Sequence, residues 1–186
     1  MTKSTWQKML DGEEHLDYDP QLVVMRRRCR KLLDSFNRSE EDWPQKKQLL
    51  EELFERPLGD DFYIQSPFYC DYGVNISIGR NFEANFNVVM LDCGRIDIGD
   101  NVFIAPAVQI YTVFHPLERH RRAERYIATR PVSIGNDVWL GGGSIVLPGV
   151  SIGDNCVIGA GSVVTKDIPA NSIAVGNPCK VIRQLD

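Results

Sequence analysis

The most regular feature of the sequence is an aliphatic residue at every sixth position over the C-terminal third of the chain. The run is unbroken over Ile134, Leu140, Val146, Ile152, Ile158 and Val164. The same interval separates Ile98, Ile104 and Ile110, and it recurs more weakly at Ile78, Ala84 and Met90. A period of six fits neither an amphipathic helix nor one long strand. It predicts a coil of three short strands, each pointing one aliphatic side chain to the axis.

Glycine followed by Asp or Asn supplies the corners of this coil. Such triplets stand at 99–101, 135–137 and 153–155. These residue types adopt the left-handed backbone conformation that a tight corner needs. Coils stacked at about 4.8 Å, the spacing of paired strands, would make about five coils into a prism roughly 25 Å tall. An antiparallel sandwich with regular turns is the alternative, and the unbroken spacing argues against it.

The first 57 residues have a different pattern, which predicts two or three helices. Apolar residues of 20–37 fall mostly on one helical face, and 39–54 opens with Ser-Glu-Glu-Asp, a favourable cap and first turn. We therefore expect a helical segment over 1–57, a β-helix over 58–178 and a tail over 179–186. Open coil ends invite pairing with other chains, so the helices or the tail should cover them.

The six-residue spacing is lost between Ile110 and Val132, which predicts an extruded loop over 112–131. Loops that project from a rigid scaffold often carry catalytic or binding residues. It holds His115, between Phe114 and Pro116, whose imidazole has a reference pKa of about 6.5 and suits a general base. A hydrogen-bonded structural histidine is the alternative for His115. His120 lies in a run of charges that is typical of solvated surface.

Composition and charge indicate that the protein binds a small molecule rather than a nucleic acid or a membrane. The 186 residues carry a net charge of −4, which does not favour binding to nucleic acid or to a membrane. The basic run 26–31 has acidic neighbours and is interpreted as a solvated helix face. With neither a signal peptide nor 18 consecutive apolar residues, the protein is expected to be soluble and cytoplasmic. Its five cysteines are odd in number and lack a CxxC pair, which predicts reduced structural thiols.

Several motifs together resemble the maltose/galactoside O-acetyltransferase family, which includes the nodulation-type sugar acetyltransferases. They are Glu-Ala-Asn-Phe-Asn at 83–87, Phe-His-Pro at 114–116, Asp-Val-Trp-Leu-Gly-Gly at 137–142, the segment 159–169 and Gly-Asn-Pro at 176–178. The resemblance covers nearly the whole chain. It implies a left-handed parallel β-helix, whose hand the period alone does not fix, and a homotrimer. Acetyl-CoA and a sugar acceptor would meet between neighbouring subunits, without a metal.

The resemblance also implies a role for individual residues. His115 matches the general base that deprotonates a sugar hydroxyl for direct attack on the acetyl thioester, and Asn85 matches the transition-state site. Residues matched to acceptor binding are Asp17, Asp71, Asn85, Asp92 and Trp139. Residues matched to coenzyme A binding are Gly142, Ala160, Thr165, Lys166, Lys180 and Arg183. From residue type alone, the aspartates, Asn85 and Trp139 could equally be corner or contact residues.

Two positions depart from the galactoside-type pattern. Position 71 is Asp, as in maltose-type members, where galactoside enzymes tend to have Ser, and Cys93 replaces a common acidic residue. These departures argue against a galactoside as the preferred acceptor.

Two other functions compete with sugar acetylation. Hexapeptide-repeat carbonic anhydrases need three histidines around Zn²⁺, whereas His15, one of only three here, lies in the predicted helical segment. A β-helix without activity is the second alternative, and the intact His115, Asn85, Lys166 and Arg183 argue against it. The sequence therefore predicts an acetyl-CoA-dependent sugar O-acetyltransferase and leaves the exact acceptor open.

Overall fold

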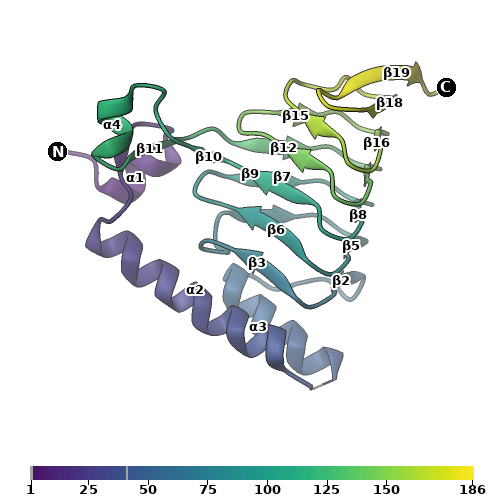
Figure 1. The fold of residues 1–186 in the computed structure, drawn as a ribbon. Helices are drawn as coiled ribbons and strands as arrows, with labels where there is room; N and C mark the ends of the chain where they lie inside the picture. The colour runs from purple at the N-terminus through teal and green to yellow at the C-terminus, as the bar shows by residue number, and fades with distance from the viewer. Residues whose placement is uncertain (1, 41) are drawn as a thin grey trace.

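The structure is a computed structural model, and it describes residues 2–40 and 42–186. The chain winds into a three-sided prism of stacked coils, with two long helices at one end and a folded loop projecting from one side (Figure 1). The described residues form five coils and the first strand of a sixth. This is the left-handed parallel β-helix that the six-residue period and the family resemblance predict.

Each side of the prism is one parallel sheet. The first sheet contains β2 (Phe62–Ile64), β5 (Phe82–Ala84), β8 (Phe103–Ile104), β13 (Trp139–Leu140), β16 (Val157–Ile158) and β18 (Ser172–Val175). The second sheet contains β3 (Phe68–Cys70), β6 (Val88–Leu91), β9 (Gln109–Tyr111), β14 (Ile145–Val146) and β17 (Val163–Val164). The third sheet contains β4 (Ile76–Ile78), β7 (Ile96–Ile98), β12 (Val132–Ile134) and β15 (Ser151–Ile152).

The aliphatic residues of the repeat form the core. In the first sheet Leu140 pairs in register with Ile104 on one side and Ile158 on the other. All three side chains are buried, and equivalent stacks fill the other two sheets. Burying one such side chain contributes about 1.5–3 kcal/mol. The predicted spacing of inward-facing positions is confirmed.

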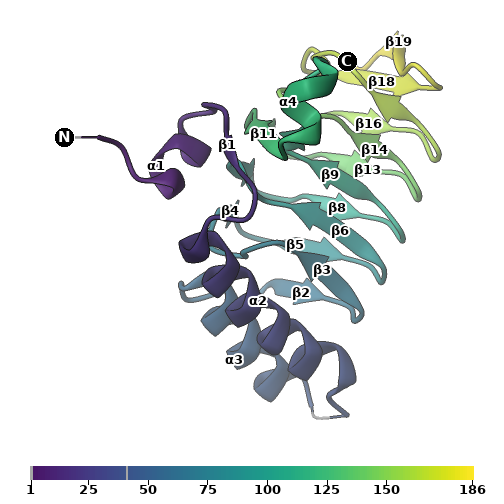
Figure 2. The ribbon, with the colours of Figure 1, turned by 60° about the vertical axis from the view of Figure 1, so that its left-hand side comes forward.

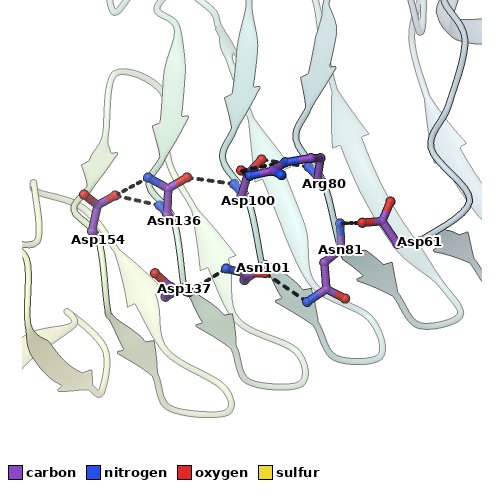
Figure 3. A network of polar contacts seen from close by, with 8 residues as sticks. All are labelled: Asp61, Arg80, Asn81, Asp100, Asn101, Asn136, Asp137 and Asp154. Carbon is purple, nitrogen blue, oxygen red and sulfur yellow. Dashed lines mark hydrogen bonds and ion pairs between the residues drawn. The ribbon is translucent and has the colours of Figure 1, made fainter.

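The corner between the third and first sheets carries a ladder of Asn and Asp side chains along the prism, the corner ladder (Figure 3). The residues with positive φ there are Asn81, Asn101, Asp137, Asn155 and Asn171. The amide of Asn81 donates to Asn101 over 2.9 Å, and the amide of Asn101 donates to Asp137 over 2.8 Å. At Gly135 an added Cβ would lie 2.7 Å from the backbone nitrogen of Asp154 and 2.9 Å from the carbonyl carbon of Gly153, so this corner position requires glycine.

Helices cover one end of the prism. The N-terminal elements are α1 (Thr5–Leu10), β1 (His15–Leu16), α2 (Pro20–Arg38) and α3 (Trp43–Phe54). The side chain of Asp19 caps α2 by accepting from the backbone N–H of Gln21. In both views α2 and α3 lie beside β2 and β3, at the opposite end from β18 (Figures 1 and 2). At that far end β19 (Lys180–Gln184) pairs antiparallel with β18 and closes the first sheet.

The segment extruded after β9 is folded rather than irregular. It contains β10 (Val113–Phe114), α4 (Arg119–Ala123) and β11 (Tyr126–Thr129). β11 pairs antiparallel with both β10 and β1, so the loop and the N-terminal segment share a small sheet, the loop sheet. His15 therefore lies on a strand and not in a helix. Among the described residues, no helix is long and apolar enough to cross a membrane.

Candidate active site

The corner between the second and third sheets is the irregular edge of the prism. Inward-facing positions there are separated by eight residues in the first coil, Cys70 to Ile78, and again in the second coil, Met90 to Ile98. In the third coil the same corner contains the extruded loop, between Ile110 and Ile134. Extra chain in three successive coils therefore collects polar residues at one edge.

Asp92 occupies the centre of this edge. Its carboxylate has no exposed surface and accepts from the backbone N–H groups of Asp71 and Tyr72 over 2.9 and 2.8 Å. A third N–H, that of Asn75, lies 3.3 Å away. Burial, together with the nearby carboxylate of Asp71, raises the pKa of Asp92 to about 7. In the structure this predicted acceptor-binding residue is buried, and its carboxylate holds the backbone that carries Asp71.

Asp71 stands in front of this buried carboxylate and is half-buried. The thiol of Cys93 donates to its Oδ2 over 3.3 Å. Burial raises the pKa of Asp71, and the hydrogen bond from Cys93 opposes the shift. A carboxylate at the rim of such a corner can accept hydrogen bonds from the hydroxyls of an acceptor.

Arg26 links the edge to the helices. Its guanidinium donates to the hydroxyl of Tyr72 over 2.8 Å and lies 3.2 Å from the carboxylate of Asp17. The interpretation of 26–31 as a solvated helix face is wrong for this residue, whose side chain is 16% exposed. The signal was present in the sequence, because Arg26 lies four residues after Leu22 and three before Cys29, on the buried face of α2.

His115 follows β10 at the same corner and is exposed. Its Nδ1 lies 3.2 Å from the backbone carbonyl of Tyr126. A carbonyl can only accept, so Nδ1 carries the proton and Nε2 keeps a free lone pair. The ring borders a groove of about 370 Å³ whose other residues include Arg130, Leu147 and Thr165. The structure thus places the predicted general base beside Thr165, a predicted coenzyme A residue.

Asn85 and Trp139 lie elsewhere on the same chain. Both border a hollow of about 180 Å³ on the first sheet and at its corner with the second. The Oδ1 of Asn85 accepts from the backbone N–H of Phe86 over 2.9 Å, and its amide nitrogen has no hydrogen-bond partner among the described residues. Within one chain, His115 is on a different corner from Asn85 and Trp139.

The predicted coenzyme A residues form three groups. Gly142 and Ala160 lie at the corner between the first and second sheets, in adjacent coils. Thr165 and Lys166 follow β17 at the corner of His115. Lys180 and Arg183 lie on β19. The three cations, Lys166, Lys180 and Arg183, are exposed and form no ion pair within residues 2–40 and 42–186.

Elsewhere in the described part of the chain, no three His, Cys, Asp or Glu side chains are grouped to hold a metal ion. The fold and the site are those expected of a hexapeptide-repeat acyltransferase: a β-helix with a histidine on its extruded loop, which borders a groove together with Thr165.

Comparison with known proteins agrees with this class. Residues 8–57 match the family model described as the maltose acetyltransferase hexapeptide capping motif, and residues 131–166 match the hexapeptide repeat of succinyl-transferase. The galactoside O-acetyltransferase of Escherichia coli is 42% identical over 176 residues, which cover 94% of this chain and 86% of that protein.

Two solved structures are similar over almost the full length. A maltose O-acetyltransferase from Clostridium difficile 630 has a TM-score of 0.96 at 46% identity, covering 99% of this chain and 98% of that one. A galactoside acetyltransferase in complex with coenzyme A has a TM-score of 0.93 at 41% identity, covering 100% and 92%. This chain belongs to the maltose/galactoside O-acetyltransferase family, and it is an acetyl-CoA-dependent O-acetyltransferase.

Proposed function

We propose that the acetyl acceptor is a sugar hydroxyl and that His115 is the general base. The observation that carries this proposal is the hydrogen bond from Nδ1 to the carbonyl of Tyr126, which leaves Nε2 as the proton acceptor of a ring that borders the groove. Nε2 takes the hydroxyl proton while the oxygen attacks the thioester carbonyl. The tetrahedral intermediate then expels the thiolate of coenzyme A, which takes the proton from the imidazolium. A well-placed general base contributes about 10²–10⁴-fold to such a rate.

Direct transfer is favoured over an acyl-enzyme because no cysteine suits a nucleophile. Burial raises the pKa of Cys70, Cys93, Cys156 and Cys179, which disfavours their thiolates, and Cys29 has no exposed surface. All five cysteines are free thiols. Because thiols stay reduced in the cytoplasm, we propose a cytoplasmic location.

Acceptor binding is assigned to Asp71 and Asp17, with Asp92 as the residue that positions Asp71. Asp71 has its carboxylate beside Cys93, and Asp17 is held by Arg26. We propose a maltose- or glucoside-type acceptor in preference to a galactoside, because positions 71 and 93 depart from the galactoside pattern.

The proposed assembly is the homotrimer that the family resemblance implies, and the outward-facing rows of the three sheets support it. On the first sheet the row in register is Tyr63, Glu83, Phe103, Trp139, Val157 and Ile173. On the second it is Tyr69, Val89, Gln109, Ile145 and Val163. On the third it is Ser77, Asp97, Ser133, Ser151 and Asp167. The first and second sheets are thus largely apolar on the outside, and the third is polar. This pattern suits a ring in which each subunit contacts its two neighbours through the first and second sheets.

In this ring the first sheet of one subunit faces the second sheet of the next. Asn85 and Trp139 of one subunit then meet His115 of its neighbour, which a single chain does not allow. The free amide of Asn85 can donate to the oxyanion of the tetrahedral intermediate. Coenzyme A would lie in the same cleft, its pantetheine against Gly142 and Ala160 beside Thr165, and its phosphates near the three unpaired cations, Lys166, Lys180 and Arg183.

The test compares the two histidines of the extruded loop. We expect His115→Ala to lower sugar-dependent thiol release from acetyl-CoA by about 10²–10⁴-fold, with little change in the Kd for coenzyme A. His120→Ala, on α4 in the same loop, is the matched control and should retain the rate. A His115→Ala variant that keeps the rate would contradict the assignment.

A further inference from the structure

Glu83 places a charge on an otherwise apolar face. It lies on β5 in the outward-facing row of the first sheet, where its neighbours in register are Tyr63 and Phe103. Its carboxylate is exposed and makes no ion pair or hydrogen bond among the described residues. It borders the same hollow as Asn85 and Trp139. In the proposed homotrimer a neighbouring subunit covers this face, where an unpaired charge is costly. The carboxylate therefore requires a cationic partner.

Arg130 is an unpaired cation at the His115 corner. It precedes β12 and is the one lysine or arginine among the described residues that border the His115 groove. Its guanidinium lies 5.2 Å from the ring centre of Phe114, within the range of a cation–π contact. Its stem packs over Gly149, where an added Cβ would lie 3.0 Å from the Cδ of Arg130. The side chain is thus held on two sides, yet within the described residues its charge has no anionic partner.

We propose that Glu83 of one subunit forms an ion pair with Arg130 of the next subunit across the active-site cleft. This inference rests on the proposed homotrimer. When subunits contact through the first and second sheets, the ring axis is parallel to the prism, and equal coils lie at equal heights. Glu83 is in the second coil, and Arg130 ends the extruded loop of the third. Their backbones therefore differ in height by about 5 Å, one strand spacing, which two long side chains can span.

Other cations of the neighbouring subunit fit this role less well. The outward-facing row of the second sheet contains no lysine or arginine, so the partner of Glu83 has to come from an edge of that sheet. In the extruded loop, Arg121 is paired with Glu14, and Arg122 donates to two backbone carbonyls. Arg130 is the cation that is both unpaired and beside the groove.

The ion pair acts on the two catalytic groups through their neighbours in the chain. Glu83 lies two residues before Asn85, and the guanidinium of Arg130 lies over Phe114, the residue before His115. Joining Glu83 to Arg130 therefore fixes the separation between the proposed oxyanion donor of one subunit and the general base of the next. Both are positioning residues, because neither touches the reacting atoms.

The kinetic test exchanges the two charges. Glu83→Arg and Arg130→Glu each place like charges across the cleft, so each should lower sugar-dependent thiol release by about 30-fold or more. The double variant restores an ion pair at every interface and should return the rate to within about fivefold of the wild type. Arg119→Glu, on α4 of the same loop, is the matched control. It should retain the rate and should not rescue Glu83→Arg. A double variant as slow as the product of the two single effects overturns the inference.

Mixed trimers test whether the pair joins two subunits. When the Glu83→Arg chain and the Arg130→Glu chain are co-expressed, every contact between unlike chains brings one glutamate to one arginine. The mixture should therefore be about tenfold more active than either variant alone. A mixture no faster than its components contradicts a pair between subunits.

Light scattering separates this inference from the proposed sugar acceptor. If no saccharide supported thiol release, the acceptor proposal would fail, but the stability of the trimer would still report the pair. The protein concentration at which the trimer dissociates should rise about tenfold in each single variant and return toward the wild-type value in the double variant. A trimeric wild type whose dissociation is indifferent to both substitutions overturns the pair alone. A monomeric wild type overturns the pair together with the proposed assembly.

Discussion

A buried carboxylate normally has a cationic partner, but Asp92 is held by backbone N–H groups. The N–H groups of Asp71, Tyr72 and Asn75 converge on it because the corner between the second and third sheets has two additional residues in the first coil. The carboxylate therefore fixes the shape of the segment that carries Asp71. The cost is the burial of a charge, which appears as a raised pKa.

This raised pKa predicts a pH dependence of stability. With a pKa of about 7 in the folded chain and about 3.9 unfolded, the folded state binds a proton more tightly. The contribution is fully present below about pH 4 and is lost as the pH rises to about 7. We expect the free energy of unfolding of the wild type, relative to Asp92→Asn, to fall by about 2–3 kcal/mol between pH 5 and pH 8.

Urea unfolding at both pH values measures this difference. Asp34→Asn, at an exposed position on α2, is the control and should differ from the wild type equally at pH 5 and pH 8. A constant difference between wild type and Asp92→Asn would show that Asp92 does not titrate in this range.

At the scale of elements, the corner ladder ties successive coils together and has one interruption. Asn81 donates to Asn101, Asn101 donates to Asp137, and Asn155 donates to Asn171. Within the described residues no side-chain hydrogen bond joins Asp137 to Asn155, because a carboxylate has no N–H to offer the next coil.

We expect Asp137→Asn to extend the ladder and stabilise the fold. The new amide can donate to Asn155 while still accepting from Asn101, and Asn tolerates the φ of 57° at this position. The gain should be about 0.5–1.5 kcal/mol, one net hydrogen bond, and should raise the Tm. Asp97→Asn, which removes the same charge from β7 outside the ladder, should not reproduce it; equal stabilisation by both would assign the effect to charge alone.

For the whole molecule, the proposed trimer rests on the contrast between the apolar and polar faces of the prism. We expect Ile145→Lys, on the second sheet, to reduce the molar mass from trimer to monomer and to abolish sugar-dependent thiol release, because an unpaired charge at a buried interface costs several kcal/mol. Ser151→Lys, in the same coil on the third sheet, should preserve both. Light scattering gives the mass, and a trimeric, active Ile145→Lys would refute the proposed interface.

The sequence by itself determined the β-helix, because one aliphatic residue every six positions admits few other packings, and Gly, Asn and Asp mark its corners. It also singled out His115, since the loss of period exposes a loop. The eight-residue steps from Cys70 to Ile78 and from Met90 to Ile98 break the period of six. In those coils the period gives no indication that Asp71, Asp92 and the loop share one edge.

Only the tertiary structure decided which polar groups face each other. The register of coils 20 residues apart buries Asp92 behind Asp71, and the packing of α2 turns Arg26 inward to Tyr72. The antiparallel pairing of β1 with β11 joins the extruded loop to the N-terminal segment. These contacts join residues far apart in sequence, and a local pattern of hydrophobic and polar positions specifies the faces of elements but not which faces meet.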